Sequence, residues 1–97
     1  MEELLTRIKE LSAKEKKTLE QMVLKLSEEV GETSQALLSY KGAPGSEYKK
    51  LGKADVEEEC VDVMIVALSL FYKLNQDEGA LEHYLKMKVD KWSSVMT

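Results

Sequence analysis

The stretch ECVDVMIVALSLFY, residues 59–72, decides the fold of this chain. Two acidic residues, Glu59 and Asp62, lie at its start, and an apolar run interrupted by a single serine follows. Apolar residues occupy nearly every side of a helix drawn through this stretch, and such a helix is buried on nearly every side. A chain of 97 residues has too few helices to cover it alone. We therefore expect an all-α fold that assembles as a homo-oligomer, either a homodimer or a homotetramer.

Periodicity and helix-breaking residues predict one domain, residues 1–97, built from four helices. Two segments match a capping box, Ser12-Ala-Lys-Glu15 and Asp55-Val-Glu-Glu58, and each is expected to begin a helix. Gly42-Ala-Pro-Gly45 is expected to end the helix before it, and one helical turn is expected around Tyr48 to Leu51. The predicted elements are a short N-terminal helix at residues 1–11 and main helices at residues 15–40, 55–74 and 79–95.

The predicted helices carry apolar stripes that are expected to pack together. In the second helix the stripe steps by four and three residues, as one helix face does, and its members are Leu19, Val23, Leu26, Val30, Thr33 and Leu37. Cys60 is expected as a small buried residue of the third helix. Trp92 lies on the stripe of the last helix, so we expect it in the core or in a subunit interface.

Charge and composition exclude several classes of protein. The chain has 14 basic and 18 acidic residues and a net charge of −4, so no broad basic face for nucleic acid is expected. The longest apolar run is too short to span a membrane, and no basic-then-apolar signal segment begins the sequence. A single cysteine allows no internal disulfide. We expect a cytoplasmic protein that binds neither membranes nor nucleic acids.

Two pairs of acidic residues are the candidates for chemistry. Glu29 and Glu32 lie three residues apart in the second helix, and Glu59 and Asp62 lie three apart in the third, so each pair projects from one helix face. A single pair of this kind usually belongs to a solvated surface. Both pairs, however, border apolar stripes on consecutive helices whose connecting loop permits antiparallel pairing. Four converging carboxylates would repel one another unless a cation joined them, and oxygen ligands suit Mg²⁺ or Mn²⁺.

The same residues resemble the motifs of a known family. EEVGE at residues 28–32, followed after 26 residues by ECVD at residues 59–62, resembles the Glu-Glu-x-x-Glu and Glu-x-x-Asp motifs of the MazG-like all-α nucleoside triphosphate pyrophosphohydrolases. The resemblance extends from about Leu19 to Trp92 and includes the order of the helices. The N-terminal helix matches nothing specific. Each half-motif is weak alone, whereas both together, in order, make a fairly specific signal.

The resemblance implies hydrolysis of an NTP or dNTP to the monophosphate and pyrophosphate, dependent on Mg²⁺, by a homo-oligomeric helical bundle in nucleotide-pool house-cleaning. Carried over by position in the motif, the implied metal ligands are Glu29, Glu32, Glu59 and Asp62. The implied catalytic residues are Glu28, with a supporting or water-orienting role, and Glu32. An acidic site of this kind holds an anionic triphosphate only through bridging metal ions.

The resemblance also implies contacts between the last helix and the phosphates of the substrate. Relatives carry a lysine there and an asparagine four residues later. Lys86 matches the lysine, but Asp90 stands where asparagine is usual and would add a negative charge beside the phosphates. Lys91 is a further candidate for substrate binding. The other interpretation of Lys86 and Asp90 is an ordinary surface ion pair four residues apart.

Other functions compete with this interpretation. A phosphoribosyl-ATP pyrophosphohydrolase has, by family resemblance, the same bundle and a similar acidic motif. A non-catalytic regulatory or assembly module would keep the fold without metal or turnover. A di-iron bundle requires Glu-x-x-His ligand pairs, which this sequence lacks. The sequence also lacks a P-loop motif, so the phosphates are not held in that way.

Overall fold

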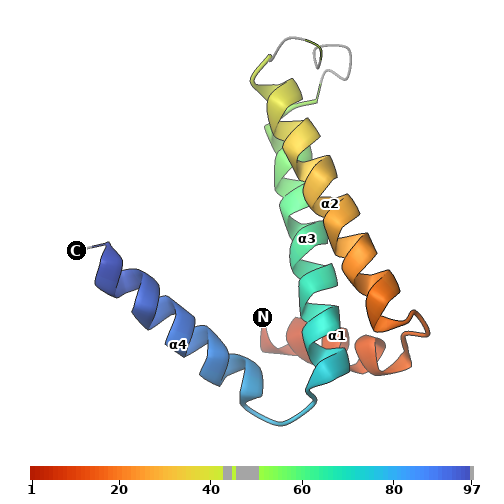
Figure 1. Ribbon diagram of the computed structural model, residues 1–97, viewed down its shortest axis with the longest axis vertical. Coiled ribbons are helices and arrows are strands. Elements are labelled where there is room, and N and C mark those ends of the chain that lie inside the picture. Colours follow the sequence, from red (N-terminus) through yellow and green to blue (C-terminus); the bar gives the residue numbers. More distant parts are fainter. Residues whose placement is uncertain (43–44, 46–50, 97) are drawn as a thin grey trace.

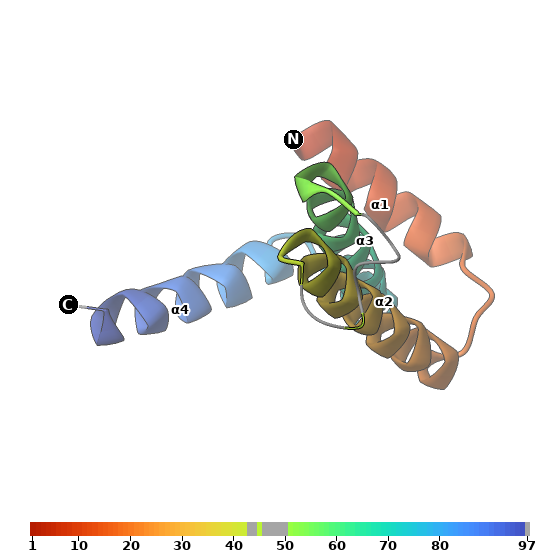
Figure 2. The same cartoon turned by 90° about the horizontal axis from the view of Figure 1, so that it is seen from above.

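Two long antiparallel helices, α2 (Leu19–Tyr40) and α3 (Lys53–Leu74), form the body of the protein (Figure 1). α1 (Glu2–Lys14) crosses the end of α3, and α4 (Ala80–Val95) extends away from the hairpin (Figure 2). The computed structural model describes residues 1–42, 45 and 51–96. Within these ranges it contains four helices and no strand, so the all-α prediction is confirmed. None of the described helices has the length and apolarity needed to cross a bilayer.

The start of α2 differs from the sequence prediction. Ser12, expected to cap this helix, lies inside α1, where its buried hydroxyl donates a hydrogen bond to the carbonyl of Ile8. The capping box is formed instead by Thr18 and Gln21. The Gln21 amide donates to Thr18 Oγ1 over 3.1 Å, and the Thr18 amide donates to Gln21 Oε1 over 2.9 Å. The predicted box was wrong because the Ser12 hydroxyl is satisfied within its own helix.

α3 also begins earlier than predicted. Lys53 is its first residue, and Asp55, expected to cap the start of the helix, lies in the first turn. There the Asp55 carboxylate accepts a hydrogen bond from the Gly52 amide over 2.8 Å, which is the reciprocal half of a capping box. The predicted bounds of the last helix agree with α4 to within one residue. The turn expected around Tyr48 to Leu51 falls mainly on residues 46–50, outside the described residues.

The contact between α2 and α3 buries a narrow face of α2. Met22 and Ala36 are 3% and 0% exposed, and Glu29 lies on the same face, seven residues from each. This face is rotated by about one residue from the predicted stripe. Four residues of that stripe are 38–48% exposed: Leu19, Val23, Val30 and Leu37. The prediction was wrong for the single chain because a small residue such as Ala36 lets α2 approach α3 more closely than a leucine does.

Two more residues expected to be buried are exposed in the single chain. Cys60 is exposed on α3, so its predicted role as a buried residue is wrong. Trp92 is 64% exposed, because α4 packs along none of the other described helices. A place for Trp92 in a subunit interface stays a prediction.

Replacing Thr18 with Ala removes the side-chain acceptor at the start of α2. We expect the free energy of unfolding to fall by about 1 kcal/mol, the usual cost of losing such a cap. Urea denaturation followed by circular dichroism, at fixed protein concentration, measures the change. Ser34→Ala is the control, because the Ser34 hydroxyl only donates to the Val30 carbonyl on the exposed side of the same helix. Equal effects of the two substitutions would contradict the cap assignment.

Candidate metal centre

Three carboxylates from two helices converge where α2 packs against α3. Glu29 belongs to α2, and Glu59 and Asp62 belong to α3. Each residue has one oxygen that lies within 4.8 Å of the corresponding oxygens of the other two. Antiparallel packing of the two helices therefore brings together three of the four predicted metal ligands. We call these three residues the acidic cluster.

The helical repeat explains why these positions meet. Glu29 occupies the buried face of α2, between Met22 and Ala36. On α3, Glu59 lies three residues after Val56 and four before Val63, and all three are partly buried. Glu59 therefore belongs to the face of α3 that packs against its neighbours. Asp62 follows one turn later and is exposed, so it lies at the edge of that face.

The charges of the acidic cluster are incompletely compensated. Glu29 is 7% exposed, and its Oε1 atom pairs with Lys25 Nζ at 3.0 Å. Its other oxygen, Oε2, and Oε2 of Glu59 are buried and accept no hydrogen bond from any residue that the structure describes. A buried carboxylate oxygen without a partner raises the free energy of the folded state, because its hydration is lost. A cation bound between these oxygens would offset that cost.

Lys25 is a charged neighbour of the acidic cluster that the sequence motif did not identify. Its ammonium lies 3.0 Å from an oxygen of Glu29 and 3.5 Å from an oxygen of Glu28. The hydrogen bond to Glu29, together with the negative charges of Glu28 and Glu29, raises the pKa of Lys25. The spacing of four residues between Lys25 and Glu29 is the sequence signal that could have revealed the pair. Glu28 itself is exposed and lies outside the group of three.

Glu32, the fourth predicted metal ligand, lies beside the acidic cluster rather than within the group of three. The negative charge of Glu29 raises the pKa of Glu32 most, followed by lost hydration and the charges of Glu59 and Glu28. The Glu32 carboxyl therefore keeps its proton to a higher pH than an isolated glutamate does. Because Glu32 is exposed, this proton can exchange with water. Glu32 is thus a titratable group at the margin of the acidic cluster.

The acidic cluster fits a hard divalent cation. Its donors are all carboxylate oxygens, which Mg²⁺, Mn²⁺ and Ca²⁺ prefer over the nitrogen and sulfur ligands that zinc usually takes. Oxygens bound to one Mg²⁺ lie about 3 Å apart when adjacent and about 4 Å apart when opposite. The oxygens of the acidic cluster, which lie within 4.8 Å of one another, would have to move closer together to bind the ion. Glu29 and Glu59 each also carry a buried oxygen, Oε2, that has no hydrogen-bond partner among the described residues.

The predicted substrate-binding residues lie on α4, away from the acidic cluster. Lys86 Nζ pairs with Asp90 Oδ2 at 2.9 Å, and both side chains are exposed, as in the ordinary surface pair that the sequence leaves open. Lys91 is exposed on the same helix. α4 projects from the hairpin in both views (Figures 1 and 2), so a single chain does not bring these three side chains to the acidic cluster.

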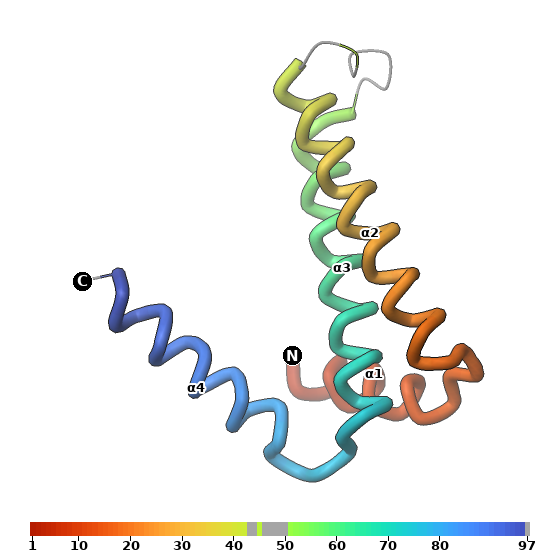
Figure 3. The backbone as a smooth tube through the Cα atoms, viewed as in Figure 1, coloured from red at the N-terminus to blue at the C-terminus, as the bar shows by residue number. Residues whose placement is uncertain are grey.

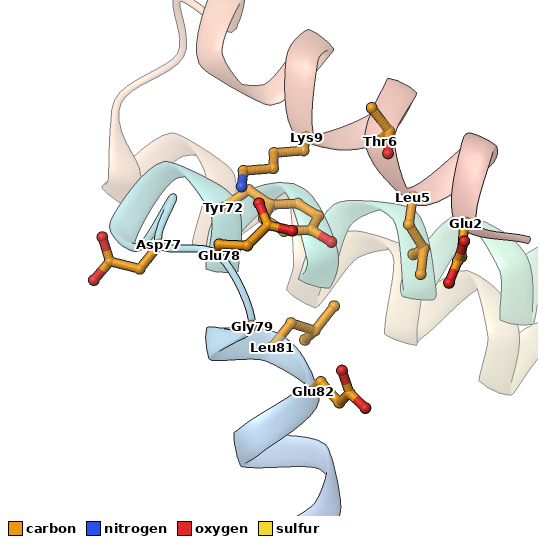
Figure 4. Close-up of a pocket in the computed structure, with 10 residues that line it drawn as sticks. All are labelled: Glu2, Leu5, Thr6, Lys9, Tyr72, Asp77, Glu78, Gly79, Leu81 and Glu82. Carbon is orange, nitrogen blue, oxygen red and sulfur yellow. The ribbon is translucent and has the colours of Figure 1, made fainter.

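A separate cleft of ≈ 450 Å³ lies where α1 meets the turn between α3 and α4 (Figure 4). Tyr72 and Leu5 are among its apolar lining residues, and Lys9 contributes a cation. Four carboxylates also line it, namely those of Glu2, Asp77, Glu78 and Glu82. An anionic triphosphate would be repelled by this lining. The cleft contains no residue of the acidic cluster, and we do not assign the substrate to it.

The raised pKa of Glu32 makes the stability of the metal-free protein depend on pH. The folded protein binds the Glu32 proton more tightly than the unfolded chain does. The free energy of unfolding therefore falls as the pH rises from the ordinary glutamate pKa through the raised folded value. Glu32→Gln removes this titration, so we expect the variant to be more stable than the wild type above that window. Urea denaturation in a chelator across the acidic pH range measures the difference.

Glu57→Gln is the matched control for this experiment, because Glu57 is exposed on α3 and is not part of the acidic cluster. We expect it to keep the pH dependence of the wild type. An unchanged or steeper pH dependence in Glu32→Gln would show that the acidic cluster does not act on this residue.

No family model, no curated protein and no solved structure matches this chain. The candidate site is therefore defined by its own residues: a buried glutamate of α2, two acidic residues of α3, and a fourth carboxyl at their margin.

Proposed function

We propose that this protein hydrolyses a nucleoside triphosphate, with ribose or deoxyribose, to the monophosphate and pyrophosphate in a reaction that requires Mg²⁺ or Mn²⁺. Water adds across the bond between the α and β phosphates. The observation that carries the proposal is the pair of buried oxygens without partners, Glu29 Oε2 and Glu59 Oε2, beside Asp62. The resemblance of the two acidic motifs to MazG-like pyrophosphohydrolases is the second support. Clearing surplus or noncanonical nucleotides in the cytoplasm is the corresponding role.

Each acidic residue has a distinct part in this proposal. Glu29, Glu59 and Asp62 are the residues that would hold the ion. When bound, Mg²⁺ would supply positive charge for the phosphate oxygens and lower the pKa of a coordinated water. Glu32 accepts a proton from the attacking water, because a raised pKa makes its carboxylate a stronger base than an ordinary glutamate. Glu28 helps to orient the water from the exposed side of α2.

Substrate contacts from α4 require a second copy of the chain. Lys86, Lys91 and Asp90 lie on a helix that projects away from the acidic cluster of its own chain. If Lys86 or Lys91 contacts the phosphates, the contact comes from the α4 helix of a partner. A homodimer or homotetramer is therefore part of the proposed function.

Product analysis tests the reaction and its substrate class. The purified protein is incubated with Mg²⁺ and a panel of NTPs, dNTPs and phosphoribosyl-ATP, and the products are separated by ion-exchange chromatography. Equal amounts of monophosphate and pyrophosphate from a nucleoside triphosphate support the proposal. Turnover of phosphoribosyl-ATP alone would reassign the substrate. Release of inorganic phosphate, or no turnover of any compound, would overturn the proposed reaction.

Replacing Glu59 with Gln removes one charge from the acidic cluster while keeping the shape of the side chain. We expect kcat to fall at least about a hundredfold, because metal-assisted stabilisation of the transition state is worth several kcal/mol. Pyrophosphate release under saturating nucleotide and Mg²⁺ measures kcat, and circular dichroism verifies that the helices remain. Glu57→Gln makes the same chemical change two residues earlier, outside the cluster. Full activity of Glu59→Gln, or an equal loss in Glu57→Gln, would refute the assigned site.

Mg²⁺ binding at the acidic cluster should stabilise the fold. We expect Mg²⁺ to raise the Tm of the wild type and of Glu57→Gln, because a ligand that binds only the native state shifts unfolding to higher temperature. We expect no such rise in Glu59→Gln or Asp62→Asn. Thermal denaturation with chelator and with increasing Mg²⁺ measures the shift. A wild type that is indifferent to Mg²⁺ and Mn²⁺ would favour a non-catalytic helical module.

A further inference from the structure

The apolar stripe of α4 has no partner within its own chain. Leu85, Val89 and Trp92 step by four and three residues along one helix face and are 53–64% exposed. We call these residues the α4 stripe. None of the residues of α4 is buried, and the helix packs along none of the other described helices. A contiguous exposed apolar face of this kind marks an interaction surface.

A second exposed stripe lies on α2. Its members are 38–48% exposed and recur at the spacing of one helix face: Leu19, Val23, Val30 and Leu37. We call them the α2 stripe. It runs nearly the whole length of α2, beside the face that meets α3. Each chain therefore presents two apolar stripes on helices that do not pack along each other in the described part of the chain.

The turn between α3 and α4 holds the α4 stripe away from its own hairpin (Figure 3). Gln76 Nε2 donates a hydrogen bond to the carbonyl of Tyr72 over 2.9 Å. Gly79 precedes α4 with φ at 78°, a left-handed conformation that favours glycine. The ring of Tyr84 meets the ring of Phe71 edge-on, with centroids 5.9 Å apart. Folding α4 back onto α2 of the same chain would require a different turn and would break the contact between Phe71 and Tyr84, which favours a second chain as the occupant of the α2 stripe.

The exposed area of the chain fits a second copy as that occupant. The radius of gyration is 16.0 Å, whereas a compact domain of this length has about 12.5 Å. The chain exposes 7637 Å², about 2,000 Å² more than a compact monomer of 11.0 kDa. Two chains that each buried this excess would share an interface of about 4,000 Å², which is the size found in obligate homodimers. No unrelated partner is needed to cover the excess.

We propose that two copies of this protein exchange their α4 helices, so that the α4 stripe of each covers the α2 stripe of the other. The exchange gives a closed, two-fold symmetric dimer in which both stripes are satisfied. The inference extends the oligomeric part of the proposed function, and it holds whether or not the protein hydrolyses nucleotides. Its tests therefore use association alone, and their failure is distinguishable from a failure of the hydrolase proposal.

Two matched substitutions on α4 test the interface. Val89 and Met87 are 53% and 49% exposed, but they lie on opposite faces of the helix, so Val89→Glu charges the α4 stripe and Met87→Glu does not. We expect sedimentation velocity at about 10 µM to show a dimer or larger assembly for the wild type and for Met87→Glu. We expect association of Val89→Glu to weaken at least about tenfold, as for a core interface residue. A monomeric wild type, or equal behaviour of the two variants, would overturn the proposal.

Energy transfer between chains tests the exchange itself. The protein has one tryptophan, Trp92 on α4, and one cysteine, Cys60, exposed on α3. A Cys60→Ser chain supplies the Trp92 donor, and a Trp92→Phe chain labelled at Cys60 with a naphthalene sulfonate supplies the acceptor. Because neither chain carries both groups, transfer occurs only between copies. We expect mixing to quench Trp92 and association to shift its emission to the blue. A dimer without transfer, or with solvent-exposed Trp92 emission, would overturn the exchange.

Discussion

The contact between α2 and α3 contains an ionised side chain at a place where two packed helices usually present apolar ones. Glu29 lies between Met22 and Ala36 on the buried face of α2, and among the described residues only its Oε1 atom has a partner, Lys25. Burying that charge costs stability, and the cost rises further because Glu59 and Asp62 lie opposite. A leucine at position 29 would pack more favourably. In the proposed function, a bound cation supplies the positive charge that this arrangement lacks.

Lys25 offsets part of this cost without filling the gap. Its ammonium forms an ion pair with Oε1 of Glu29 and a second ion pair with Oε1 of Glu28. The two oxygens that remain without partners, one on each helix, face a site with net negative charge. The pKa of Glu32 is raised chiefly by the negative charge of Glu29, and the charge of Glu59 contributes as well. Charge, burial and unmet hydrogen bonding therefore identify one location, which is why the proposed activity rests on it.

The helices and all three residues of the acidic cluster could be predicted from the sequence, because both depend on repeats that are local. Spacings of three and seven residues place Glu29, Glu59 and Asp62 on faces that antiparallel helices bring together. The predicted start of α2 was wrong, although the sequence contains a second match to the same capping pattern, Thr18-Leu-Glu-Gln21. Ser12 and Thr18 both match a capping pattern, and only the hydrogen bond of Ser12 to Ile8 excludes the first.

The predicted stripe of α2 failed for a related reason. Periodicity located a broad apolar arc correctly, but it could not tell which edge of the arc meets α3 and which faces outward. Small residues such as Ala36 and Ser39 mark the face of α2 that packs against α3, because they allow the two helices to approach closely. Their low hydrophobicity makes this face hard to recognise from the pattern of apolar residues. The larger residues are exposed in the single chain, and in the proposed dimer an exchanged α4 would cover them from another chain. The spacing of apolar residues in one sequence does not show which helix of another chain packs against them.

Ala36 has a consequence for ion selectivity. It lies two turns beyond Glu29 on the face that meets α3, and its methyl group is fully enclosed. Side chains at such contacts set the distance between helix axes, and that distance sets the gap between Glu29 on one helix and the carboxylates on the other. A bulkier residue at position 36 would widen the gap toward the longer oxygen distances that Ca²⁺ accepts and Mg²⁺ does not. In the proposed function, the preferred ionic radius would thus be governed partly by a side chain that ligates nothing.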